Sequence, residues 1–209
     1  METALEAVLV KRLGIVEYAP ALEAMRGFTA QRTESTPDEI WVLEHPAVYT
    51  FGLGADQKHG PRVSSRIPVV QVERGGEITY HGPGQAVVYT LIDLSRRGLK
   101  VKPFVALLEQ SVIDFLAKYQ VRAERKPGAP GVYVDGSKIA ALGIRLSKGR
   151  SYHGLALNVD MDLSPYSAID PCGQPGLAVT QAKDLGIQGS ALELGEKLAQ
   201  LFARRLEDA

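Results

Sequence analysis

The chain contains a single cysteine, Cys172, in the segment IDPCGQPG, where it lies between a proline and a glycine. Buried cysteines that act as apolar filler more often lie inside a strand or a helix. A flanking glycine leaves the sulfur accessible and leaves a backbone N–H available to an oxyanion. The segment is therefore compatible with a thiol nucleophile, while an inert loop cysteine is the alternative interpretation.

A lysine in a second segment could supply the base that a thiol requires. Lys138 begins the run KIAALGIRL, and the residues directly after it are all small or apolar. A strand of this kind is expected to be covered on both faces, and desolvation lowers the pKa of a lysine towards the range of a general base. A lysine that reaches out to water from the end of its strand is the alternative.

The third segment, RGGEITYHGPGQ at 74–85, combines glycines with charged and polar side chains. Glycine permits positive φ and allows backbone N–H groups to approach a ligand closely. Gly-Pro-Gly is also ordinary turn chemistry, so two tight turns between strands would explain the same composition. Arg74 and His81, if buried beside these turns, would point to a ligand.

Several familiar motifs are absent from the sequence. There is no GxxxxGK[ST] loop, no GxGxxG segment that opens a helix and no GxSxG elbow, so that no cradle for ATP or a dinucleotide is recognisable. A single cysteine also excludes a disulfide within the chain and a cysteine-based zinc cluster. We therefore expect neither a cofactor nor a metal.

Composition restricts the class of protein further. The 209 residues are 45% hydrophobic and 23% charged, and 24 Lys and Arg balance 24 Asp and Glu. This balance argues against a broad nucleic-acid footprint or a polybasic membrane anchor. Neither an apolar stretch of ~20 residues nor a signal peptide is recognised. We expect one domain over 1–209, located in the cytoplasm, with no membrane or nucleic-acid partner.

The elements that would position these segments can be read from local patterns. Extended segments are predicted before residue 18, within 39–52 with a break at His45-Pro46, and at 68–73, 77–81 and 86–94. Helices are predicted from about Pro20, over 103–119, and after a capping box at Ser190–Glu193. Asp135-Gly136 and 148–150 predict hairpins among strands 131–134, 138–146 and 151–159. The class is α+β, a mixed, largely antiparallel sheet flanked by helices.

Together, the three segments resemble the octanoyltransferases of lipoate synthesis. The pattern is RGG-x-x-T-x-HGPGQ at 74–85, Gly-x-Lys-Ile-Ala at 136–140, His153-Gly154 with Asn158 four residues later, and Pro-Cys-Gly at 171–173. The part that carries these motifs covers about residues 40–175. Tyr133 stands where tryptophan is expected at least as often.

The resemblance implies the fold of the catalytic domains of biotin and lipoate protein ligases. It also implies transfer of an octanoyl group from acyl carrier protein to a lysine of a lipoyl domain, as the first step of endogenous lipoate synthesis. The acceptors would be the lipoyl domains of 2-oxoacid dehydrogenase complexes and the glycine-cleavage H protein. The resemblance assigns the acyl-thioester nucleophile to Cys172 and the lowering of its pKa to Lys138. It assigns substrate binding to Arg74, Gly75, Gly76, Glu77, Ile78, Thr79, Tyr80, His81, Ala141, Leu142, Gly143, Gly154, Leu155 and Ala156.

Some alternatives stay open at this point. His81 or His153 could replace Lys138 as the base, and the oxyanion could be held by N–H groups near Lys138–Ile139 or Gly75–Gly76. An acidic carrier protein would need a basic surface, for which the candidates are Arg145, Lys148, Arg150, Arg96, Arg97 and Lys100. The competing functions are an ATP-dependent lipoate or biotin ligase and a non-catalytic module that binds acyl groups or their carrier.

Overall fold

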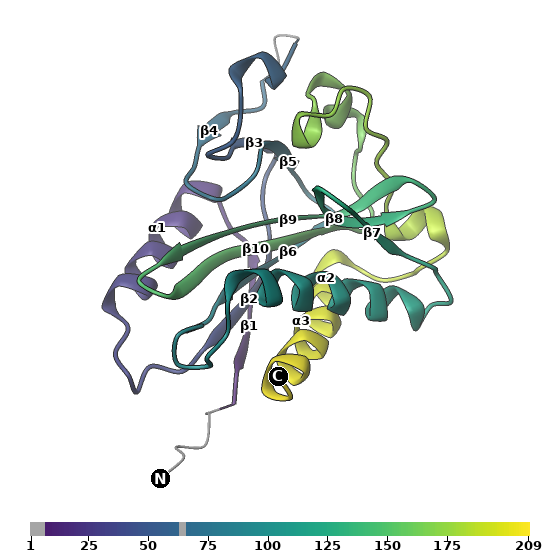
Figure 1. Ribbon diagram of the computed structural model, residues 1–209. Helices are drawn as coiled ribbons and strands as arrows, with labels where there is room; N and C mark the ends of the chain where they lie inside the picture. The colour runs from purple at the N-terminus through teal and green to yellow at the C-terminus, as the bar shows by residue number, and fades with distance from the viewer. Residues whose placement is uncertain (1–6, 63–65) are drawn as a thin grey trace.

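The chain is built on two β-sheets that lie one above the other (Figure 1). The computed structural model describes residues 7–62 and 66–209, apart from the side chains of Gln57 and Cys172. The large sheet has the order β1 (Leu9–Ile15), β2 (Glu39–Glu44), β6 (Gln85–Leu91), β10 (Arg150–Asn158), β9 (Ser137–Ser147), β8 (Ala129–Val134) and β7 (Glu124–Lys126). The small sheet has the order β4 (Val69–Gln71), β3 (Val48–Phe51) and β5 (Ile78–His81).

Most strand pairs in the two sheets are antiparallel. The exceptions are β1 with β2 and β3 with β4, which run parallel. The predicted class, a mixed and largely antiparallel α+β fold, is therefore confirmed. The sequence patterns did not predict that the strands divide between two sheets.

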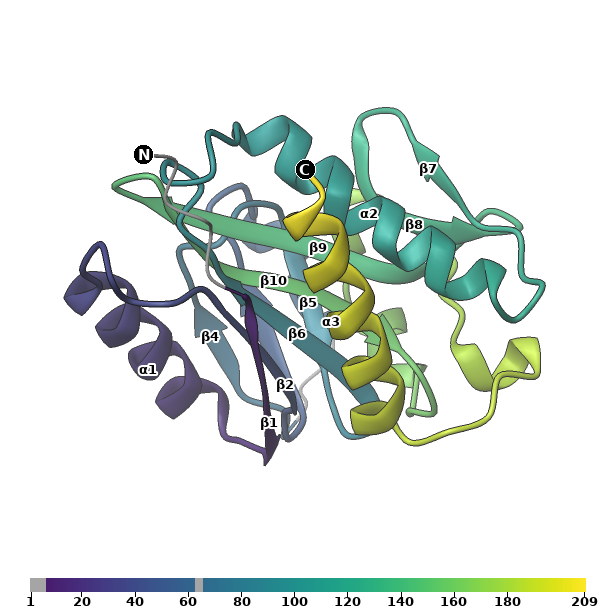
Figure 2. The same ribbon diagram turned by 90° about the horizontal axis from the view of Figure 1, so that it is seen from below.

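Helices cover the large sheet on both faces (Figure 2). On one face, α2 (Val101–Ala117) and α3 (Ala191–Glu207) pack against the sheet, and the predicted stripe with Phe104, Leu108 and Val112 is fully buried there. The opposite face meets α1 (Tyr18–Gln31) and the small sheet. The Ser190 hydroxyl accepts from the N–H of Glu193, whose carboxylate accepts from the N–H of Ser190, so that the predicted capping box is confirmed.

Two tight turns fix the register of β8, β9 and β10. Asp135 and Gly136 have φ of 46° and 82°, and Lys148 and Gly149 have φ of 50° and 77°. Positive φ at both central residues is the mark of the type I′ turn, whose twist matches that of the strands it joins. Both predicted hairpins are confirmed, and they set β9 between its two neighbours.

Two features of the large sheet were not predicted. The strand β7 consists of ERK, which has none of the β-branched or aromatic residues that signal a strand. The pairing of β1 depends on a partner some 30 residues away in the chain, and its outer face leaves Leu9, Leu13 and Ile15 exposed. Helices in the described residues lack the combination of length and apolar character that a bilayer span requires.

Candidate active site

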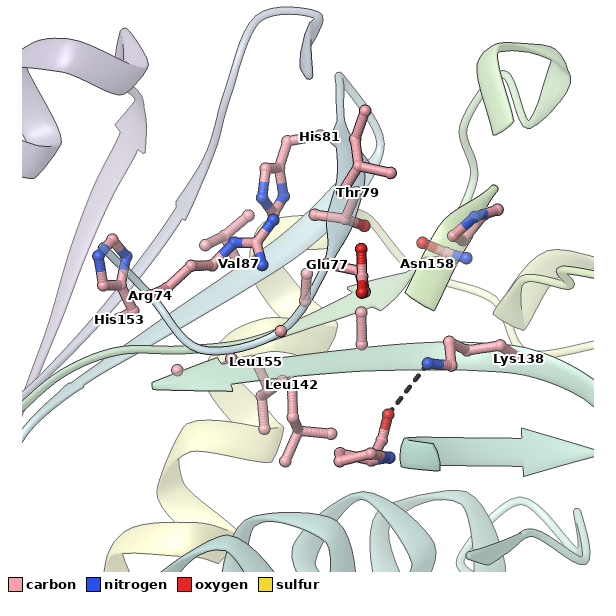
Figure 3. A pocket seen from close by; sticks show the side chains of 18 of the residues that line it. Arg74, Glu77, Thr79, His81, Val87, Lys138, Leu142, His153, Leu155 and Asn158 are labelled. Carbon is pink, nitrogen blue, oxygen red and sulfur yellow. Dashed lines mark hydrogen bonds between the residues drawn. The ribbon is translucent and has the colours of Figure 1, made fainter. Parts of the chain in front are cut away.

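A cavity of about 300 Å³ lies between β5 with the loop before it on one side and β9 with β10 on the other (Figure 3). This volume is at the lower end of the range for small-molecule sites. The lining residues that the sequence predicted are Arg74, Gly76, Glu77, Ile78, Thr79, His81, Lys138, Ala141, Leu142, Gly143, Gly154, Leu155 and Ala156. The remaining ones are Tyr18, Val87, Tyr89, Gly128, Ala129, Pro130, His153, Asn158, Tyr166, Pro171, Gln174 and Val179.

Lys138 lies at one end of the cavity and is almost completely buried, at 3% exposure. Its Nζ donates a hydrogen bond of 3.0 Å to the carbonyl oxygen of Pro130, drawn as a dashed line in Figure 3. The same atom lies 5.2 Å from the centre of the Tyr133 ring, within the range of a cation–π contact. The side chain is thus held inside the protein and does not extend from the strand end into water.

A β-bulge aims Lys138 at the cavity. The register between β8 and β9 shifts, so that Val132 faces Ala140 while Tyr133 faces Lys138, and Ile139 is the extra residue. Side chains alternate along a regular strand, and a bulge resets that alternation. As a result, Lys138 lines the cavity together with Ala141, while Ile139 and Ala140 pack into the helix-covered core.

The cysteine-bearing segment is tied to Lys138 through the backbone. Lys138 N–H donates to Ala178 O at 2.8 Å, and Thr180 N–H donates to Lys138 O at 3.0 Å. Cys172 lies in the 3-10 turn Pro171–Gly173, and its side chain is outside the described part of the chain. Residues on both sides of it, Pro171 and Gln174, line the cavity. The turn that carries Cys172 and the buried Lys138 therefore border the same cavity.

A second loop supports the same turn from outside. Asp170 N–H donates to His59 O, and a Cβ added to Gly173, whose φ is 64°, would lie 3.2 Å from the His59 ring and 3.4 Å from the Glu77 carboxyl group. His59 Nδ1 and Glu77 Oε2 are 3.4 Å apart. Only glycine combines this positive φ with so close an approach.

Arg74 connects the glycine-rich loop to the small sheet. Its guanidinium donates to the carbonyl and the hydroxyl of Thr50 at 2.7 and 2.8 Å, and to Gly75 O at 3.1 Å. Gly75 N–H in turn donates to Ile144 O of β9. A Cβ on Gly143 would come within 2.8 Å of Gly75 O, so glycine at 143 allows the loop to lie directly on the strand.

A buried hydrogen-bond network holds His81 at the cavity wall. The amide of Gln85 donates to Asn158 Oδ1 and to the hydroxyl of Tyr166 at 3.0 Å each, which leaves its oxygen to accept from His81 Nδ1 at 2.7 Å. Burial, with the nearby His45 and Arg74, lowers the pKa of His81 to about 3. The imidazole is therefore neutral at pH 7, with its proton on Nδ1.

Gly75 and Tyr80 are the predicted binding residues that do not line the cavity. Gly75 faces β9 as described above, and the Tyr80 ring packs against Tyr49 and Tyr166 on the other side of β5. Among the residues that the prediction missed, Val87 and Tyr89 alternate with the helix-facing Ala86 and Val88 on β6. Their spacing was visible in the sequence, but nothing local shows which face of a fully apolar strand borders a cavity.

The hydrogen bonds and ion pairs also test the predicted oxyanion hole and the predicted basic surface. The N–H groups of Lys138 and Gly75 donate within the protein and are not available to an oxyanion. The N–H groups of Ile139 and Gly76, the other members of the two predicted pairs, stay predictions. Arg97 is buried and binds Asp38, and it is therefore not part of a basic surface. Arg145 is another candidate for the basic surface, and it lies 145 − 138 = 7 residues beyond Lys138 along β9, or about 23 Å from it along the strand.

The described residues contain no group of three or more His, Cys, Asp or Glu side chains suited to a metal ion.

A third histidine behind the cavity wall makes the fold sensitive to acid. His45 Nδ1 donates to Val16 O and its Nε2 accepts from the Tyr89 hydroxyl, both at 2.6 Å, and burial lowers the pKa of His45 to about 4. In the unfolded chain a histidine titrates near 6.5. Between pH 6.5 and 4 the unfolded chain therefore binds a proton that the folded chain does not, so that the free energy of unfolding falls as the pH falls.

We expect His45→Gln to remove about 1 kcal/mol from the stability difference between pH 7.5 and pH 5.5. Glutamine can donate to Val16 O and accept from Tyr89 without titrating. The measurement is urea unfolding of both proteins at both pH values. An equal pH difference in the variant and the parent would contradict the assignment.

Comparison with known proteins agrees with this architecture. Residues 17–200 match the family described as the lipoyl protein ligase A/B catalytic domain. Among similar curated proteins, the octanoyltransferase of Azoarcus sp. (strain BH72) is 59% identical over 95% of this chain and 88% of its own length. The octanoyltransferase of Dechloromonas aromatica (strain RCB) is 56% identical over 95% of this chain and 97% of its own.

Solved structures of lower sequence identity share the fold. A bi-partite lipoate protein ligase from Thermoplasma acidophilum superimposes with a TM-score of 0.71 at 14% identity, over 97% of this chain and 92% of its own. Biotin protein ligase from Aquifex aeolicus gives a TM-score of 0.58 at 11% identity, over 97% and 71% of the two chains. The fold predicted from the sequence resemblance is thus confirmed.

Proposed function

Because this chain belongs to the octanoyltransferase family of lipoyl protein ligase A/B catalytic domains, we propose that it moves an octanoyl group from acyl carrier protein to a lysine of lipoyl domains. The acceptors are the lipoyl domains of 2-oxoacid dehydrogenase complexes and the glycine-cleavage H protein, and the reaction takes place in the cytoplasm. The donor is a thioester, which is already activated for acyl transfer, so the chemistry needs no nucleotide.

In the first half-reaction Lys138 takes the proton of the Cys172 thiol, and the thiolate attacks the carbonyl carbon of the donor thioester. The tetrahedral intermediate collapses as the bond to the carrier sulfur breaks. Lys138 returns the proton to the departing carrier thiolate. Octanoyl-Cys172 remains, with the acyl chain in the apolar part of the cavity beside Leu142 and Leu155.

In the second half-reaction the acceptor lysine attacks the thioester carbon of octanoyl-Cys172 as a neutral amine. Lys138 removes a proton from the nitrogen as the amide forms, and the Cys172 thiolate that leaves takes that proton back. The reaction is favourable because an amide is more stable than a thioester. The acceptor arrives where Glu77 borders the cavity, next to the turn that carries Cys172.

The backbone pairing of Lys138 with 178–180 is the observation that carries this proposal. It ties a buried lysine to the chain that directly follows the cysteine turn, and both border one cavity. The neutral imidazoles do not offer an equivalent arrangement. Burial lowers the pKa values of His81 and His153 to about 3, so that both imidazoles are weak bases at pH 7. His153 also lies opposite Ile144, about 20 Å along the strand from Lys138.

The test is the intact mass of the protein after incubation with octanoyl-acyl carrier protein. We expect the wild type to gain one octanoyl group and Cys172→Ala to gain none, and addition of a lipoyl domain should transfer the group to that domain. Absence of an adduct on the wild type would refute the thioester mechanism. Activity with free octanoate and ATP that is undiminished in Cys172→Ser would instead identify a ligase.

A further inference from the structure

His153 points to the opposite face from the one its position in β10 dictates. Tyr152 and Ala156 pack on the side of the small sheet, whereas Leu155 and Leu157 belong to the core on the helix side. Regular alternation would place residue 153 with the second group. Its ring instead stacks on that of Tyr152, with the centroids 5.1 Å apart and the planes at 25°, and it lines the cavity.

The backbone of His153 accounts for this reversal. Its φ is 61°, in the left-handed region that residues other than glycine rarely adopt, although the pairing of β10 with β9 continues on both sides. A conformation of this kind is strained, and such strain collects at sites that bind or react. The strain therefore has the effect of turning an imidazole out of the apolar core and into the cavity.

One nitrogen of the imidazole brought there lacks a hydrogen-bond partner among the described residues. His153 is 1% exposed, and within the described part of the chain no group hydrogen-bonds its Nε2. Burial is the main cause that lowers the pKa of His153 to about 3, with Arg74 adding to the effect, so the ring is neutral at pH 7. A buried polar atom without a partner is unfavourable unless a ligand or a water molecule satisfies it.

The position of His153 shows which part of a substrate it would meet. His153 and Lys138 lie at opposite ends of the cavity, with Arg74 and Leu155 between them (Figure 3). His153 pairs with Ile144, which is 144 − 138 = 6 residues from Lys138, or about 20 Å of strand. An extended chain advances about 3.3–3.6 Å for every three bonds, so the seven bonds of an octanoyl chain span roughly 8 Å. The rest of the 20 Å between the backbones of Lys138 and His153 accommodates the Lys138 side chain, the thioester and the imidazole.

We infer that this remote end of the cavity is a subsite for a hydrogen-bonding atom at the far end of the acyl chain, and that the enzyme accepts ω-hydroxyacyl groups of octanoyl length through His153. A hydroxyl both donates and accepts, and it therefore fits either tautomer of a neutral imidazole. The inference deepens the proposed acyl transfer and rests on it.

The experiment compares kcat/KM for octanoyl- and 8-hydroxyoctanoyl-acyl carrier protein in the wild type, His153→Phe and His153→Asn. The wild type should use the two donors within about threefold of each other. Phenylalanine keeps the ring but loses the polar atoms, so His153→Phe should discriminate against the hydroxylated donor by roughly ten- to hundredfold. Asparagine tolerates positive φ and can still hydrogen-bond, so His153→Asn should keep a ratio between the two donors closer to that of the wild type than His153→Phe does.

A wild type that rejects the hydroxylated donor tenfold or more would overturn the inference, and so would an unchanged donor ratio in His153→Phe. The second result would mean that a water molecule satisfies Nε2. Thermal unfolding checks that each variant is folded. If His153→Phe does not fold, the ratio of kcat/KM for the two donors in the wild type decides alone. Absence of transfer from both donors would refute the proposed function, which separates that failure from a failure of the subsite.

Discussion

Replacing Lys138 with methionine is expected to lower kcat/KM for octanoyl transfer by about 10²–10⁴-fold, the contribution typical of a positioned acid–base group. Methionine has nearly the same length and is apolar, so it fills the buried space that lysine leaves. The substitution removes the amine that accepts a proton and returns it in each of the two half-reactions. Steady-state kinetics measures the loss, and single-turnover mass spectrometry should show that octanoyl-Cys172 forms slowly.

Lys126→Met is the matched control for this substitution. Lys126 contacts the same aromatic ring, with its Nζ 4.4 Å from the centre of Tyr133 compared with 5.2 Å for Lys138, but it is not among the residues that line the cavity. Its replacement should leave kcat/KM within about twofold. Formation of acyl-enzyme at the normal rate in Lys138→Ala, together with its loss in His81→Ala, would show that the histidine is the base.

Gly131→Ala is expected to reduce kcat/KM by about 10²-fold without contact with the substrate. A Cβ at this position would lie 2.8 Å from Ala140 O, 3.0 Å from Lys138 Cε and 3.1 Å from Lys138 Nζ, and the φ of 137° is itself unfavourable for alanine. The carbonyl belongs to the neighbouring strand and cannot easily move, so the lysine must shift. Displacement of a reacting group by about 1 Å can cost two orders of magnitude in rate.

Gly189→Ala separates this effect from backbone strain. Gly189 has nearly the same φ, 139°, but its added Cβ would meet only the flexible side chain of Leu194, at 3.0 Å. Gly189 is in the turn before α3 and does not line the cavity. Both variants should lower the midpoint of thermal unfolding, and only Gly131→Ala should lose activity. Equal activity in the two variants would contradict the proposed constraint on Lys138.

The elements that the sequence predicted well are those with local signals. The capping box at Ser190 and the apolar stripe of α2 lie within single helices, and the two glycine-containing turns need only their own residues to adopt positive φ. The parallel partner of β1 and the strand β7 depend on contacts with distant parts of the chain. No local pattern encodes those contacts, so the sequence did not predict the strand β7 or the partner of β1.

The same distinction applies to the site. The resemblance brought Arg74, His81 and Lys138 forward as candidates, and the three line one cavity. Tyr18 did not stand out, because an aromatic residue that opens a helix looks like any other core residue in a sequence. His153 was considered only as an alternative base. Its left-handed backbone contradicts the alternation expected of a strand, so a strand pattern cannot reveal which face it occupies.

The two type I′ turns that flank β9 also bear on how this enzyme can change in length. A residue inserted at Asp135-Gly136 or Lys148-Gly149 would slide one strand past the next, and each such step reverses the face on which a side chain emerges. Insertions and deletions at those turns should therefore abolish activity, because they would move Lys138 off the cavity face of β9. Natural variation in length, and any tag or domain inserted by design, is therefore expected to be absent from both hairpins.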